Sequence, residues 1–143
     1  SLNALLQNIV TLLEAEWQKA GIRFAFQPAS SLPSITGDEE PLHQAFLNIL
    51  LNACQAMPTG GTVRIATEVE GRGTVKVTIA DEGVGIPSED LEKIFALYYT
   101  TKPEGSGIGL SLVYRTVQLH DGSIDVSSEI GRGTTATIRF PVD

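Results

Sequence analysis

The stretch Asp81-Glu-Gly-Val-Gly-Ile-Pro87 constrains both the fold and the function of this sequence more than any other. It follows an alternating apolar run that ends at Ile79, so Asp81 closes a predicted strand with its side chain on the buried face. A buried carboxylate needs hydrogen-bonding partners, because leaving it unpaired is costly. Gly83 and Gly85 lack a Cβ and can adopt positive φ, which lets backbone lie against a flat ligand. The stretch therefore predicts a binding loop at a strand end.

Taken alone, the same residues would favour an ordinary turn in which the aspartate caps the residues that follow it. The stretch is not a dinucleotide fingerprint, because a third glycine is missing and Pro87 follows. A Walker A loop is also excluded, since the chain contains no Gly-Lys-Ser/Thr. The interpretation as a binding site therefore depends on two further motifs.

The upstream motif is a pair of asparagines, Asn48 and Asn52. Residues four apart on a helix lie on one face, and this pair falls at the edge of an apolar stripe. Their amide groups can hold a cation or phosphate oxygens. The alternative is a structural pair of hydrogen-bonded amides.

The downstream motif is the glycine-rich segment Gly105-Ser-Gly-Ile-Gly-Leu110, which opens a predicted helix. Free amides and the positive end of the helix dipole favour an anion at such a position. A loop with three glycines is also suited to act as a lid, and a plain flexible loop is the alternative. Lys102 is the nearest basic side chain that could meet a phosphate, unless it is simply a solvated surface lysine. In this order, the three motifs predict a nucleotide pocket.

The rest of the chain supplies further helices and strands. Helices and antiparallel strands segregate, so we expect an α+β two-layer sandwich that forms a single domain over residues 1–143. Asp38 is expected to cap the second helix, and His120 to cap the end of the last one. The predicted elements are a helix at 2–20 with apolar positions Leu5, Leu6, Ile9, Leu12, Leu13 and Trp17, a strand at 22–26, a helix of about 20 residues from Asp38 with the stripe Leu42, Phe46, Ile49, Ala53 and Met57, strands around 63–67 and 75–79, a short helix at 88–97, a helix ending near 121–122, and a hairpin turning at 131–133.

Composition narrows the class of function. A formal charge of −7 argues against nucleic acid as a partner, because that would need a basic face. No apolar run approaches the roughly 18 residues of a membrane span, so we expect no direct membrane contact. Cys54 is the one cysteine, which excludes an intrachain disulfide and fits a reducing, cytoplasmic location. The composition is that of an ordinary globular chain.

These motifs resemble those of the catalytic and ATP-binding domain of sensor histidine kinases, and most closely the nitrogen-regulation type. The resemblance runs from about residue 2 to Pro141. The matching segments are Asn48-Ile-Leu-Leu-Asn52-Ala53, Asp81-Glu-Gly-Val-Gly-Ile-Pro87, Ile94-Phe95 through Thr100-Thr101-Lys102, Gly105-Ser-Gly-Ile-Gly-Leu110 and Gly131-Arg-Gly-Thr134. They correspond in order to the N box, the first glycine box, the F box, the second glycine box and the final Gly-x-Gly-Thr of that family.

The resemblance implies a Bergerat fold, in which helices cover one face of a mixed sheet, with ATP and Mg²⁺ as cofactors. It implies that Asn52 holds Mg²⁺, that Asp81 binds the adenine amino group, and that Thr134 anchors adenine through water. Gly83 and Gly85 would shape the adenine loop, while Gly107 and Gly109 would lie by the phosphates. The other implied nucleotide contacts are Ile86, Lys102, Gly105, Ser106, Ile108 and Leu110.

Two positions depart from the family pattern. Many members carry a basic residue three places after the metal-binding asparagine, where this chain has Gln55. Lys102 could supply the phosphate contact instead. The F box reads Ala96-Leu-Tyr-Tyr99 where an acidic residue, a proline and a phenylalanine pair are common.

Asn48 bears on the reaction. Related topoisomerase, mismatch-repair and chaperone ATPases carry a glutamate there as a general base, and an amide cannot take a proton at neutral pH. The resemblance therefore implies slow hydrolysis and transfer of the γ-phosphoryl group to a histidine. That histidine would lie on an upstream dimerisation segment that we expect to precede residue 1, so the 143 residues by themselves should not autophosphorylate.

Three functions remain open from the sequence. The first is the catalytic domain of a two-component sensor kinase, with a response regulator as a further partner and a parent protein whose membrane anchorage is undetermined. The second is a freestanding serine kinase of the anti-sigma-factor type. The third is a degenerate module that binds a partner protein without nucleotide, and the intact Asn52, Asp81 and glycine boxes disfavour it.

Overall fold

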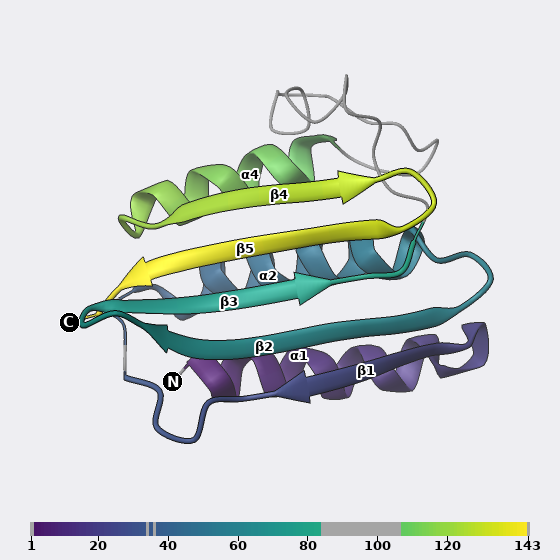
Figure 1. Ribbon diagram of the computed structural model, residues 1–143, viewed down its shortest axis with the longest axis horizontal. Coiled ribbons are helices and arrows are strands. Elements are labelled where there is room, and N and C mark those ends of the chain that lie inside the picture. Colours follow the sequence, from purple (N-terminus) through teal and green to yellow (C-terminus); the bar gives the residue numbers. More distant parts are fainter. Residues whose placement is uncertain (1, 34, 36, 84–106, 143) are drawn as a thin grey trace.

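The computed structural model describes residues 2–33, 35, 37–83 and 107–142. They form one five-stranded sheet with helices packed on a single face (Figure 1). The strand order is β1-β2-β3-β5-β4. The elements are α1 (Leu2–Trp17), the 3-10 turn η1 (Gln18–Ala20), β1 (Ile22–Gln27), α2 (Glu39–Gln55), β2 (Gly61–Glu70), β3 (Thr74–Ala80), α4 (Gly107–Leu119), β4 (Ser123–Glu129) and β5 (Gly133–Pro141).

The sheet is mixed. β1 pairs with β2 in parallel, while β2–β3, β3–β5 and β4–β5 are antiparallel. The parallel pair follows from the connection through α2, because a strand must cross over a helix to return in the same direction. The predicted two-layer α+β sandwich, with a mixed sheet covered on one face, is confirmed.

The core lies between the helices and one face of the sheet. Strand residues alternate between the two faces, and the inward set is apolar. All five residues of the stripe predicted on the second helix are buried, but Met57 lies beyond the end of α2 at Gln55. The inward strand residues are Val63, Ile65, Val75, Val77, Ile79, Ala136, Ile138 and Phe140.

The stripe predicted on α1 is wrong at one position. Leu12 is 49% exposed, whereas Val10, which was not predicted, is buried. The buried residues of α1 follow the spacing of a single helix face, and Leu12 falls outside it. No helix among the described segments is long and apolar enough to span a bilayer.

His120 links the start of α2 to the end of α4, while the cap predicted for Asp38 does not form. Asp38 precedes α2, but its side chain makes no capping hydrogen bond. Its backbone N–H instead donates to Nε2 of His120 at 3.1 Å. Nδ1 of the same ring lies 2.8 Å from the carbonyl oxygen of Thr116, so the proton sits on Nδ1. The predicted capping role of His120 is confirmed, and the ring also connects two helices.

Candidate functional site

Three polar side chains end three neighbouring strands at one edge of the molecule. Asp81 directly follows β3, Thr134 lies near the start of β5 and Ser128 near the end of β4. Each continues the inward alternation of its strand, beyond Ile79, Ala136 and Val126 in turn. In Figure 1 this is the right-hand end of the sheet, where α2 ends and α4 begins. The topology therefore brings the three polar residues together at the end of the sheet where α2 ends and α4 begins, on the face that the helices cover.

The carboxylate of Asp81 is held by two backbone amides. Its Oδ1 accepts hydrogen bonds from Gly83 N at 2.8 Å and from Thr134 N at 3.2 Å. The backbone of Asp81 also donates to the carbonyl oxygen of Thr134 at 2.9 Å. The expectation that this carboxylate has hydrogen-bonding partners is confirmed. Its bond to Gly83 N is also the turn-capping contact that a plain strand end would make, so Asp81 both caps the loop and joins β5.

Gly83 is needed for the close approach of protein backbone. A Cβ on this residue would lie 2.5 Å from the carbonyl oxygen of Ala56, at the end of α2. The loop after β3 therefore rests on the last turn of the helix that carries Asn48 and Asn52. The structure therefore requires a glycine at position 83 because of this contact with Ala56, independently of any ligand.

Glu82 anchors the same loop to β2, a contact that was not predicted from the sequence. Its Oε1 accepts from Thr62 N at 3.1 Å, and its Oε2 lies 3.3 Å from Nη1 of Arg64. The backbone N–H of Glu82 contacts Sδ of Met57 at 3.4 Å. These partners lie on β2 and in the connection that precedes it, and nothing in the local sequence around Glu82 identifies them.

Asn48 and Asn52 are both half-buried on α2. The neighbouring Cys54 thiol is buried, and desolvation, followed by the negative charge of Asp81, raises its pKa to about 12. The Asp81 carboxylate therefore lies close enough to Cys54, in the last turn of α2, for its charge to act on the thiol. Within the described ranges no three His, Cys, Asp or Glu residues gather as a metal site. An amide oxygen such as that of Asn52 suits Mg²⁺, which prefers hard oxygen ligands and keeps several waters.

The second glycine segment is partly described. α4 begins at Gly107, so the predicted helix start within the segment is confirmed, and Ile108, Gly109 and Leu110 lie in the first turn. In Figure 1 this start lies at the same end of the molecule as the turn between β4 and β5. The remaining predicted contacts and the predicted short helix at 88–97 lie outside the described residues. Those contacts are Gly85, Ile86, Lys102, Gly105 and Ser106.

Thr134 is hydrogen-bonded across the β4–β5 ladder to a residue that the sequence analysis missed. It lies directly opposite Ser128, with 2.8 Å between the two hydroxyl oxygens. Ser128 Oγ also donates to the carbonyl oxygen of Gly133 at 3.0 Å. The alternation of Ile124 and Val126 with polar residues would have placed Ser128 on the inner face. Its pairing with Thr134 required the register of the hairpin.

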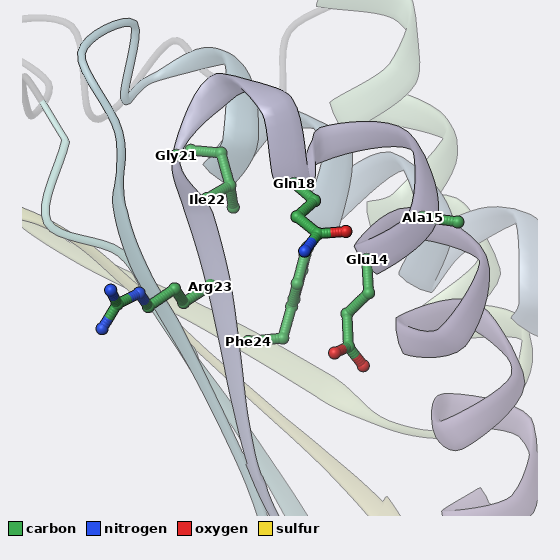
Figure 2. A pocket seen from close by; sticks show the side chains of 7 residues that line it. All are labelled: Glu14, Ala15, Gln18, Gly21, Ile22, Arg23 and Phe24. Carbon is green, nitrogen blue, oxygen red and sulfur yellow. The ribbon is translucent and has the colours of Figure 1, made fainter.

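A surface hollow elsewhere does not belong to this site. It has a volume of about 550 Å³ and lies between the end of α1 and β1, on the far edge of the sheet from β4 (Figure 2). Figure 2 shows Gln18 and Phe24 facing the space between the helix and the strand, while Arg23 points away. The lining residues are Glu14, Ala15, Gln18, Gly21, Ile22, Arg23 and Phe24, none of which was predicted to bind nucleotide.

Comparison with known proteins agrees with this geometry. Residues 37–143 match the family described as histidine kinase-, DNA gyrase B- and HSP90-like ATPases. The sensor histidine kinase ZraS of Escherichia coli K12 is 37% identical over 142 residues, which cover 99% of this chain and 30% of ZraS. The histidine-protein kinase AtoS of the same organism is 37% identical over 143 residues, or 24% of its length. The chain thus spans less than a third of these relatives.

Solved structures give the same result. The nucleotide-free catalytic domain of the histidine kinase ThkA superposes with a TM-score of 0.87 and 29% identity, covering 98% of this chain and 91% of that one. Full-length ShkA in complex with AMPPNP gives a TM-score of 0.88 and 28% identity over 100% of this chain and 31% of ShkA. The chain therefore belongs to the family of histidine kinase-, DNA gyrase B- and HSP90-like ATPases, as the ATP-binding catalytic domain of a sensor histidine kinase.

Proposed function

We propose that this domain binds Mg-ATP at the end of the sheet where β3 ends, on the face that the helices cover. It would donate the γ-phosphoryl group to a histidine on an upstream dimerisation segment of its parent protein. The observation that carries the proposal is the position of Asp81. Its carboxylate is fixed by two amides at the end of β3, and the loop that follows rests on the end of α2, the helix that carries Asn52. That arrangement suits an adenine amino group at the carboxylate and phosphates at the N-terminus of α4.

The nature of Asn48 supports transfer over hydrolysis. A water molecule that attacks the γ-phosphate needs a group that orients it or accepts its proton, and a neutral amide is a poor base. Phosphoryl transfer to a protein side chain instead depends on positioning the reactants and on stabilising the charge of the phosphates. Asn48 and Asn52 are the residues of α2 to which we assign these tasks, with the Asn52 amide oxygen as the ligand of Mg²⁺.

The remaining nucleotide contacts follow the motifs. We assign the adenine loop to Gly83, Gly85 and Ile86, and the adenine-anchoring hydroxyl to Thr134. We assign the phosphate contacts to the second glycine segment, Gly105-Ser-Gly-Ile-Gly-Leu110, and to Lys102. Lys102 would replace the basic residue that many family members carry at the position of Gln55. Mg²⁺ would supply charge neutralisation when bound.

The cellular setting follows from the relatives that carry the same domain. We infer that the 143 residues act as one domain of a larger two-component kinase, whose partners are the dimerisation and histidine-phosphotransfer segment and a response regulator. A formal charge of −7 supports a function without nucleic acid. ATP is an intracellular substrate, so the domain is assigned to the cytoplasm whether or not its parent is anchored to a membrane.

Calorimetric titration of the chain with AMPPNP, with and without Mg²⁺, tests the binding site. We expect saturable binding that Mg²⁺ strengthens, and a loss of at least about tenfold in Asp81→Asn, since an amide replaces a charged acceptor. Asp125→Asn is the matched control, because Asp125 belongs to β4 and pairs with Arg139 on the opposite face of the sheet. Binding that is equal in the wild type and Asp81→Asn would refute the assignment.

A second experiment tests the reaction. The domain is expressed together with the segment that precedes it in the parent protein and incubated with γ-labelled ATP and Mg²⁺. We expect an acid-labile phosphohistidine and little release of inorganic phosphate. Acid-stable phosphoserine on a partner protein would replace this proposal with the serine-kinase alternative.

A further inference from the structure

We propose that Ser128 is a positioning residue for nucleobase recognition: it holds the hydroxyl of Thr134 so that Thr134 presents only lone pairs to the base. The proposal rests on the proposed function, in which Asp81 and Thr134 recognise adenine. It adds a residue of β4 that lies in none of the five motifs, and it gives that residue a chemical task.

The direction of the hydrogen bonds follows from two contacts of Ser128 Oγ. A serine hydroxyl has one proton. Ser128 Oγ donates that proton to the carbonyl oxygen of Gly133 at 3.0 Å. The 2.8 Å contact between Ser128 Oγ and Thr134 Oγ1 must then have Thr134 as its donor.

As a consequence, the polarity of Thr134 is fixed, in the sense that its hydroxyl can act only as an acceptor toward a ligand. With its one proton given to Ser128, Thr134 Oγ1 can only accept a further hydrogen bond. Asp81, whose Oδ1 lies 3.2 Å from Thr134 N, is also an acceptor. The pair therefore forms a surface of acceptors, which matches a donor such as the amino group at C6 of adenine and disfavours the carbonyl group that hypoxanthine and guanine carry there.

The backbone geometry keeps this polarity in place. Ser128 and Thr134 are directly opposed residues of the β4–β5 ladder, and Gly133 is the first residue of β5. Gly133 has φ +107, and a Cβ there would lie 2.1 Å from the carbonyl oxygen of Asp81. The hairpin, the serine and the strand end of Asp81 thus form one rigid unit, and rigid support of this kind is what sets the orientation of a recognition group.

Removing the Ser128 hydroxyl frees Thr134 to rotate and to donate. In Ser128→Ala we expect AMPPNP to bind about three- to tenfold more weakly, the range of one hydrogen bond. Binding of inosine 5′-triphosphate should be unchanged or stronger, because a rotated Thr134 can donate to its carbonyl group. The Kd of inosine 5′-triphosphate divided by the Kd of AMPPNP should therefore fall by at least about threefold. Ser128→Thr, which keeps a hydroxyl, should restore the wild-type ratio.

Ser127→Ala is the matched control. Ser127 is the neighbouring residue of β4 and is exposed on the open face of the sheet, opposite Thr135. Calorimetry on the wild type and all three variants, with thermal unfolding of each, separates the outcomes. A Ser128→Ala ratio equal to that of Ser127→Ala would overturn the proposal. So would equal weakening of both nucleotides with a lowered Tm, since that is the mark of a merely structural serine.

Failure of the proposed function is distinguishable from failure of this inference. If the wild type shows no saturable AMPPNP binding, or Asp81→Asn binds as the wild type does, the adenine site itself is wrong and the role of Ser128 falls with it. If the wild type binds, Asp81→Asn does not, and Ser128→Ala keeps the wild-type nucleotide ratio, the site stands and Ser128 has no part in it.

Discussion

At the scale of single residues, the strand end at Asp81 depends on backbone contacts made by glycines. Gly83 meets Ala56, and Gly133 meets Asp81 itself. From the sequence, the glycines of the first box were expected to allow the approach of a ligand. At Gly83 the protein's own backbone already fills the space where a Cβ would lie. A glycine can therefore be required for the shape of the site without touching the nucleotide.

Replacing Gly133 by alanine should be strongly destabilising. Its φ is +107, and the new Cβ would lie 2.1 Å from the carbonyl oxygen of Asp81. We expect a loss of about 1–2 kcal/mol from the left-handed backbone and a further loss of about 1–3 kcal/mol from the enforced shift of β3. Urea unfolding followed by circular dichroism measures both.

Gly131→Ala separates the two contributions. Gly131 lies in the same hairpin with φ +83, yet nothing lies within 4 Å of a Cβ built on it. This variant should show only the backbone loss, and it should bind AMPPNP as the wild type does. Equal losses of stability in Gly131→Ala and Gly133→Ala would rule out the close contact with Asp81.

At the scale of elements, the proposed nucleotide site depends on how α2 and α4 are aligned. α2 ends, and α4 begins, at the end of the sheet where β3 ends. Their other ends meet through His120, which bonds Asp38 N and the carbonyl oxygen of Thr116. The ring also packs edge-on to Phe140 of β5, with centroids 6.3 Å apart. One side chain thus joins two helices and the sheet at the end opposite the proposed nucleotide site.

His120→Ala should lower the free energy of unfolding by about 1–3 kcal/mol, because two hydrogen bonds and an aromatic contact are lost together. Asp38→Ala should lower it by less than about 1 kcal/mol, since this aspartate makes no side-chain capping bond. Chemical denaturation of the two variants and the wild type gives the comparison. A larger loss in Asp38→Ala would mean that the aspartate cap, rather than the histidine, secures the start of α2.

At the scale of the whole molecule, the face of the sheet without helices is held by charges. Lys76 of β3 lies 2.6 Å from Glu68 and 3.6 Å from Glu70, both on β2. Arg139 of β5 bridges Glu70 at 2.8 Å and Asp125 of β4 at 3.2 Å. The network crosses four strands. Exposed pairs of this kind contribute little singly, and more where several charges are linked.

This network predicts a stability that declines in acid. The hydrogen bond from Arg139, with the positive charges of Arg139 and Lys76, lowers the pKa of the Glu70 carboxyl below its usual value. A lowered folded-state pKa stabilises the protein above the unfolded pKa of about 4.3, and that contribution is lost as pH falls through the folded-state value. Glu70→Gln should therefore reduce the urea midpoint at pH 7 and leave it unchanged near pH 2.

The control for this variant is Glu16→Gln, which alters an exposed carboxylate of α1 that has no ion pair within the described part of the chain. Its midpoint should match the wild type at both pH values. Added salt should also shrink the effect of Glu70→Gln, because exposed charges are screened. A difference from the wild type that persists near pH 2, or that does not change with salt, would show that Glu70 acts through packing instead.

Much of the fold was predictable because each element carries its own periodicity. The stripe of α2 and the alternation in β2 and β3 assign an inner face to each element without reference to its neighbours. Leu12 was misassigned because the rotation of α1 about its axis is set by packing against β1 and α2. The family resemblance implied a mixed sheet, but only the structure shows that β1 and β2 are the parallel pair.

The sequence by itself determined the class of fold, the order of the motifs and the choice of Asp81 as the centre of the proposed site, because these depend on residue types and on spacing along the chain. Only the tertiary structure decided which groups surround that centre. Glu82 reaches Thr62 and Arg64, and Ser128 reaches Thr134, because the order β1-β2-β3-β5-β4 brings their strands together. Such partners depend on strand order and register, which no local pattern in the chain records.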